Sequence, residues 1–182
     1  MTLDGGSLNE RWDLAEPFAA WCERTVQHHN LWMALRARAT VPDDLVERAA
    51  ALAHRWRLLA LTEDWCGDAV NILPVIARLA ERAPDRLALR CLDRDRHLDV
   101  MDNHLTDGAR SIPKVLALDH AGSVAASWGP RPAELQTWVY REGRTLVREE
   151  RYKRVRRWYA RDKGAGTLRE LLDALESVAD TA

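Results

Sequence analysis

The sequence predicts an α/β fold with a central mixed sheet of about four strands, an N-terminal helical extension and extra C-terminal helices. Two observations predict it. Short apolar runs alternate with stretches of helical period, and the last two runs are separated by a turn signal, Ala121-Gly122. At 182 residues the chain can bury a substantial core as one domain, so we expect a single domain over residues 1–182.

The N-terminal part predicts two helices. Phe18, Cys22 and Val26 recur at four-residue spacing, so residues 14–38 are interpreted as one amphipathic helix. Thr40 is a suitable N-cap for the second helix, and Pro42 suits its first turn.

The middle of the chain alternates strands with helices. Strands are predicted at residues 57–62, 86–92, 113–119 and 124–128, and helices at 66–82 and 97–106. The last two strands form a predicted antiparallel hairpin. Residues 131–159 are expected to be helical in two pieces, and Thr167 with Glu170 forms a capping-box pattern for a last helix.

Charge gives little indication of a partner, because 30% of residues are charged but the net charge is only -1. The exception is the segment of residues 141–163, which contains ten basic and four acidic residues. This segment has two interpretations: a phosphate-binding surface with Trp158 and Tyr159 as stacking groups, or the solvated face of a long helix. We expect the second, and we do not expect nucleic acid as a partner.

The chain is expected to be cytoplasmic. Residues 1–10 lack a basic start followed by an apolar run, and no segment approaches the ~20 apolar residues of a membrane span. The cysteines Cys22, Cys66 and Cys91 lack disulfide-framework or metal-ligand spacing, which fits a reducing compartment. We therefore predict no metal, no membrane partner and no tightly bound cofactor; the oligomeric state stays open.

The stretch LTEDWCGDA, residues 61–69, is the candidate site. Cys66 lies where a strand passes into a helix, and unpaired N–H groups at a helix N-terminus favour thiolate over thiol. The alternative is a buried, inert cysteine. Asp68 has two interpretations. It is either an acidic residue that interacts favourably with the positive end of the helix dipole in the first turn, or a proton acceptor or donor for the sulfur. A carboxylate beside the sulfur, however, raises the pKa of the cysteine. Asp64 can cap the helix.

Four features resemble the thioredoxin-like superfamily over about residues 55–140. They are Trp65-Cys66 between strand and helix, Pro74 eight residues after Cys66, Ile112-Pro113 before the third strand, and the final hairpin followed by Trp128-Gly129. The stretches TEDWCGDA, SIPKVLALD and WGPRP are similar to a bacterial branch of that superfamily. The N-terminal arm, about residues 8–54, and the tail, about 141–182, fall outside the resemblance.

The resemblance implies site roles. Cys66 is the expected nucleophile, with Asp68 as its candidate catalytic partner, and Ile112-Pro113 is expected to be cis and to lie opposite the sulfur. Substrate is expected to contact Trp65, Gly67, Ile112, Pro113, Trp128 and Gly129.

Two residues depart from the family. The resolving cysteine expected three residues after Cys66 is Ala69, and the buried aspartate expected six residues before it is Ala60. We therefore expect an oxidoreductase that forms mixed disulfides through one cysteine, with a protein or small-molecule thiol or disulfide as substrate and a low-molecular-weight thiol as co-substrate. The alternative is a non-catalytic peptide-binding module. Cys22 and Cys91 are expected to be buried in the core.

Overall fold

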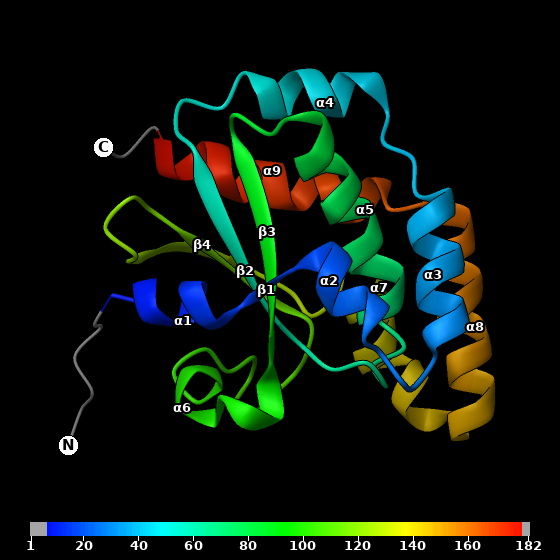
Figure 1. Cartoon of the computed structure of the whole chain (residues 1–182). Coiled ribbons are helices and arrows are strands. Elements are labelled where there is room, and N and C mark those ends of the chain that lie inside the picture. The colour runs from blue at the N-terminus through cyan, green and yellow to red at the C-terminus, as the bar shows by residue number, and fades with distance from the viewer. Residues whose placement is uncertain (1–6, 180–182) are drawn as a thin grey trace.

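The structure is a computed structural model, and it describes residues 7–179. Its centre is a five-stranded mixed sheet in the order β1-β3-β2-β4-β5, seen in Figure 1. The strands are β1 (Glu16–Pro17), β2 (Trp56–Thr62), β3 (Leu87–Asp93), β4 (Lys114–Leu118) and β5 (Val124–Trp128). The prediction that residues 1–10 lack a basic start followed by an apolar run concerns in part residues 1–6, which lie outside the described residues.

The pairing confirms the predicted mixed sheet. β2 is parallel to β3, while β2 with β4, β4 with β5 and β1 with β3 are antiparallel. The two-residue strand β1 is an edge that the sequence did not predict. β2 is the central strand, and its residues 58–62 are all buried, as expected for an apolar strand covered on both faces.

The helix α5 (Ala69–Arg82) connects β2 to the parallel strand β3. It was predicted to begin at Cys66 but begins three residues later, with Asp68 as its N-cap residue. Pro74 lies inside α5, and the helix is buried along most of its length. Cys66 therefore belongs to the turn that leads into the helix, and not to the helix itself.

The prediction of one continuous helix over residues 14–38 is wrong. The segment holds α2 (Phe18–Glu23) and α3 (His29–Arg38), and α1 (Asn9–Leu14) precedes them. The break has two visible causes. His28 has a left-handed backbone with φ 57°, and the Asp64 carboxylate accepts hydrogen bonds from the N–H groups of Val26 and Gln27, each at 2.9 Å. Asp64 thus anchors this turn and does not cap α5.

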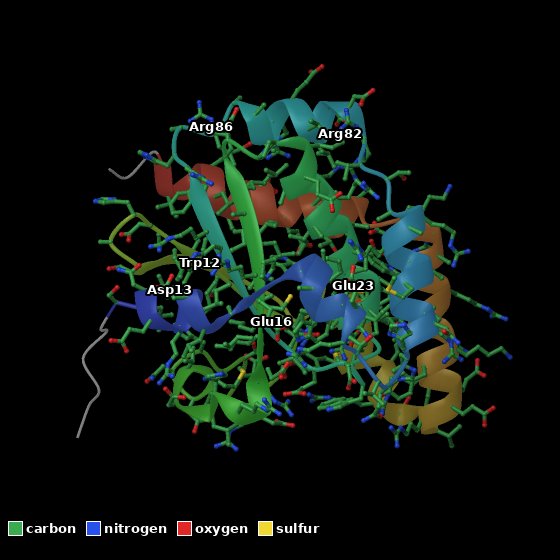
Figure 2. All side chains as sticks on the ribbon, in the orientation of Figure 1. Trp12, Asp13, Glu16, Glu23, Arg82 and Arg86 are labelled. Atoms are coloured by element: carbon green, nitrogen blue, oxygen red, sulfur yellow. The ribbon has the colours of Figure 1, made fainter. Side chains whose placement is uncertain are left out.

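The N-terminal arm is fastened to the core by arginines. The ring of Trp12 in α1, labelled in Figure 2, lies 5.7 Å from the Arg57 guanidinium and 5.0 Å from that of Arg90. At the other end, Arg82 of α5 donates to Asp43 at 3.1 Å, where α4 (Asp43–Ala50) begins. Pro42 occupies the N-cap position of α4 without a side-chain bond, so the prediction that Thr40 caps this helix is wrong.

Between β3 and β4 the predicted helix over residues 97–106 is much shorter. A 3₁₀ turn η1 (Arg94–Arg96) and a single-turn helix α6 (Leu98–Met101) take its place. The chain then makes a tight turn in which Thr106 and Ala109 exchange two backbone hydrogen bonds of 2.9 Å. Asp107 and Gly108 have φ of 50° and 75°, the left-handed conformation of a tight turn, whereas α6 has already ended at Met101.

The C-terminal helices are α7 (Ala133–Arg141), α8 (Arg148–Asp162) and α9 (Ala165–Ala179), with a 3₁₀ turn η2 (Gly143–Thr145) after α7. Figure 1 shows α9 crossing behind the sheet and α8 at the edge of the molecule beside α3. The capping-box prediction is wrong, because α9 begins before Thr167 and that side chain is fully buried. Glu170 instead bonds to β5 and α7, as described below.

Candidate functional site around Cys66

Cys66 lies in the turn between β2 and α5. Its backbone N–H donates to the Glu63 carbonyl at 3.2 Å, and its own carbonyl accepts from Val70 at 3.2 Å. The thiol lies 3.4 Å from the Ile112 carbonyl oxygen, to which it donates, and 3.4 Å from the Ala69 N–H, from which it accepts. One backbone N–H thus points at the sulfur from the first residue of α5.

The surroundings of Cys66 keep the sulfur protonated. The residue is only 6% exposed, and burial raises the pKa of its thiol from an ordinary 9.0 to about 11. The Asp68 carboxylate contributes to this rise in pKa, while the N–H groups of Ala69 and Asp68 and the Arg131 guanidinium oppose it. The expected effect of the helix N-terminus is present, since its N–H groups lower the pKa of Cys66, but desolvation and the neighbouring carboxylate outweigh it.

Asp68 is held in a buried network. Arg131 binds its carboxylate with two nitrogens, at 3.0 and 2.6 Å, and the Tyr159 hydroxyl of α8 donates to it at 2.8 Å. Arg131 also donates to Gln136 at 2.9 Å. Burial and the nearby Asp68 charge raise the pKa of Tyr159, so its hydroxyl stays a donor. Both carboxylate oxygens are therefore engaged by protein groups.

Of the residues predicted to contact substrate, Ile112 lies against the sulfur. The Ile112-Pro113 bond is cis, as expected, and both residues are buried. The backbone at Gly129 has φ 119°, and a Cβ there would collide with the Pro113 carbonyl oxygen. Trp128 is 7% exposed and donates from its ring nitrogen to Glu170 of α9 at 2.9 Å, while the other Glu170 oxygen accepts from the Ala133 N–H at 2.8 Å.

Trp65 and Gly67 lie on the open side of the turn. Trp65 is 40% exposed, and the Arg94 guanidinium lies 5.2 Å from its ring centre. Both residues line a groove of about 490 Å³ between α3 and α8, together with Leu31, Val70 and Tyr152. A Cβ on Gly67 would meet Tyr152 at an ordinary 3.9 Å, so the space at this position does not require a glycine.

The other two cysteines lie in the core, as predicted. Cys22 is 0% and Cys91 is 1% exposed, and burial raises the pKa of both thiols. All three cysteines of the chain are free. Within residues 7–179 no group of three or more His, Cys, Asp or Glu side chains is arranged to hold a metal ion. The same residues include no helix long and apolar enough to cross a membrane.

A comparison with protein families decides the affiliation of the chain. A family model described as thioredoxin matches residues 16–163. The chain belongs to the thioredoxin family. This match extends beyond the 55–140 stretch that carried the sequence resemblance, into both the N-terminal arm and α8.

Two solved structures are similar to this thioredoxin-family chain. A Pseudomonas aeruginosa protein of unknown function, PA1234, is 22% identical with a TM-score of 0.74, covering 94% of this chain and 98% of that one. An HIV epitope-scaffold protein is 21% identical with a TM-score of 0.70, covering 97% of this chain and 99% of that one. At these identities the likeness concerns the fold. No curated protein matches the chain.

Sequence reasoning missed the residues that surround Asp68. Arg131 stands inside WGPRP, but nothing in that stretch indicates a carboxylate partner 63 residues away. Tyr159, which the disfavoured phosphate-binding interpretation used as a stacking group, is buried and bonded to Asp68. Val155 and Tyr159 are the buried residues of α8 and lie four residues apart in an otherwise charged segment, and this spacing was the signal for an inward face.

Proposed function

We propose that this protein is a thiol-disulfide oxidoreductase-like protein that acts through Cys66 alone, by forming a mixed disulfide. The observation that carries the proposal is the position of the sulfur. Its thiol lies within 3.4 Å of both the Ile112 carbonyl and the Ala69 N–H, in a turn whose neighbouring residues Trp65 and Gly67 line a groove.

The proposed reaction has two exchanges. The Cys66 thiol first loses its proton to solvent, and the thiolate attacks one sulfur of a substrate disulfide, forming a Cys66–substrate disulfide and releasing the other half as a thiolate. An external thiolate then attacks the substrate sulfur and releases the Cys66 thiolate, which takes up a proton. Ala69 offers no sulfur for an internal second step, so the external thiol is required.

The high pKa of Cys66 favours a long-lived adduct. In the second exchange Cys66 is the leaving group, and a thiol with a pKa of about 11 leaves slowly. The first exchange is also slow at neutral pH, since little thiolate is present. These two effects together support a protein that retains a bound sulfur compound rather than one that passes electrons rapidly.

Asp68 is better suited to position the turn than to move protons. Its two oxygens already accept three hydrogen bonds from Arg131 and Tyr159, so both are held by protein groups. A residue with this role controls the pKa of Cys66 through its charge. Substrate approach is proposed from the side of Trp65 and Gly67, because Ile112, Pro113 and Trp128 are buried.

The test is adduct formation followed by mass spectrometry. Protein treated with a small disulfide at pH 9 is expected to hold one reductant-sensitive adduct on Cys66 that persists until thiol is added. Cys66→Ser should hold none, and Cys91→Ser should behave as wild type. Spontaneous loss of the adduct in wild type that is abolished in Cys91→Ser would identify Cys91 as a resolving cysteine and refute the one-cysteine mechanism.

A second candidate function, a non-catalytic peptide-binding module, is favoured by the 6% exposure of Cys66 and by the raised pKa of its thiol. The groove beside Trp65 would then hold a peptide without covalent chemistry. The same experiment separates the two functions. Absence of any adduct on Cys66 up to pH 10, with peptide binding retained in Cys66→Ser, would favour the binding module.

A further inference from the structure

A second cavity of about 230 Å³ lies on the other side of Asp68, between α7, α8 and the tight turn at residues 106–109. Tyr152 and Val155 line both this cavity and the groove at Trp65, so α8 separates the two. Three arginines line it: Arg131, Arg144 and Arg151. Its acidic residues are Asp68 and Asp107.

The acidic side chains are already engaged. Asp68 is bound by Arg131 and Tyr159, and Asp107 accepts a hydrogen bond from the Tyr140 hydroxyl at 2.9 Å. The cavity wall thus carries three cations against two carboxylates. A further cation lies behind it, since Lys114 is 9% exposed and donates to Thr106, which lines the cavity, at 3.4 Å.

Arg144 and Arg151 have no carboxylate partner within residues 7–179. Each is stacked on a tyrosine instead: the Arg144 guanidinium lies 4.1 Å from the Tyr140 ring centre, and the Arg151 guanidinium lies 5.8 Å from that of Tyr152. Stacking fixes a guanidinium while leaving its N–H donors free. The Ser111 hydroxyl also lines the cavity and makes no hydrogen bond to the described protein.

We propose that this cavity binds a small molecule carrying an oxyanion, a carboxylate or a phosphate group, between Arg144 and Arg151. Paired guanidinium groups match such oxyanions in geometry and charge. The volume equals that of roughly eight water molecules, which suits a small anion or the charged end of a larger ligand. This proposal does not depend on disulfide exchange at Cys66, although Asp68 and Arg131 line the cavity and also belong to the site around Cys66.

The test is calorimetric titration of the full chain with inorganic phosphate and, separately, with succinate, at constant ionic strength. We expect saturable binding of at least one anion, weakened about tenfold or more in Arg144→Gln and in Arg151→Gln. Arg157→Gln is the matched control, because it removes the same charge from α8, the helix that also carries Arg151, at a position outside this cavity. It should bind as wild type does.

The two titrations distinguish the sources of the oxyanion, since binding of phosphate alone or of succinate alone assigns the group. Thermal unfolding of each variant shows whether it is folded at the temperature of titration. Absence of saturable binding of both anions to wild type would overturn the proposal. Equal weakening in Arg157→Gln and Arg144→Gln would also overturn it, because the binding would then follow overall charge.

Discussion

The raised pKa of Cys66 predicts an unusual pH dependence of its reactivity. At pH 7 a thiol with a pKa of about 11 is ionised in about one molecule in ten thousand, against about one in a hundred for an ordinary value of 9.0. The more basic thiolate is intrinsically more nucleophilic, and a Brønsted slope of about 0.4–0.5 recovers roughly six- to tenfold. Alkylation at pH 7 should therefore be roughly tenfold slower than that of an unperturbed cysteine, before any steric effect.

The clearest signature is the shape of the pH profile. The alkylation rate should rise about tenfold per pH unit from pH 7 to 10 without reaching a plateau, since the thiolate fraction grows throughout. Cys22 and Cys91 are more deeply buried, so a Cys22→Ala, Cys91→Ala double variant isolates the signal. The measurement is the rate of iodoacetamide labelling by mass spectrometry, with thiolate absorbance near 240 nm as a second readout.

A plateau below pH 8.5 would refute this reasoning. It would mean that the N–H group of Ala69 and the Arg131 guanidinium outweigh burial and the Asp68 charge at the sulfur. A free small thiol titrated in the same buffers is the reference for intrinsic alkylation chemistry. Unfolding is excluded as a cause of faster labelling at high pH by following circular dichroism at each pH.

Three further predictions concern single substitutions. Asp68→Asn should speed Cys66 labelling at pH 8 on the order of three- to tenfold, because it removes a charge that disfavours the thiolate. It should also lower the free energy of unfolding in urea by about 3 kcal/mol, because the Arg131 charge is left without a carboxylate partner. Asp107→Asn is the control, and an unchanged labelling rate in Asp68→Asn would contradict the electrostatic account. Gly129→Ala should lower the free energy of unfolding by about 3 kcal/mol or more, since the φ of 119° at Gly129 and the Pro113 carbonyl exclude a Cβ. Gly67→Ala should change the free energy of unfolding by less than about 0.5 kcal/mol, and equal losses in the two variants would contradict this reasoning. Ala69→Cys should gain disulfide reductase activity with a dithiol-recycling system. It should lose about 1–3 kcal/mol of stability, because position 69 is fully buried and a larger side chain must fit there. Absence of reductase activity would show that the turn cannot hold a disulfide.

The sheet was largely predictable because its strands carry a local signal. Residues 57–62 and 124–128 are apolar runs between turn residues, and the observed strands β2 and β5 match them to within one residue. The helical arm was predicted less well, because the break at residues 25–28 depends on Asp64, which lies far along the chain. Periodicity reports which face is buried and not whether the backbone continues between two buried stretches.

The sequence allowed prediction only of those parts of the candidate site that lie in the motifs shared with the thioredoxin-like superfamily. The proximity of Cys66 to Ile112 followed from the family resemblance, and the structure has these residues in contact. The direction of the Cys66 pKa was not predictable from the motif, because it depends chiefly on how deeply the folded chain buries the sulfur. The C-terminal tail also fell outside the resemblance. Tyr159 and Glu170 lie in that tail, and their partners Asp68 and Trp128 could not be deduced from spacing.

The C-terminal tail, which forms α8 and α9, helps to stabilise the turn around Cys66, whose sulfur is largely buried. Tyr159 of α8 bonds to Asp68, two residues after Cys66, and Glu170 of α9 bonds to Trp128 and Ala133 at the end of the hairpin. These contacts join the C-terminal helices to the turn that holds Cys66 and to the end of β5. Because the same burial that slows attack by Cys66 also makes it a poor leaving group, a chain with Ala69 in place of a second sulfur is suited to holding an adduct once it has formed.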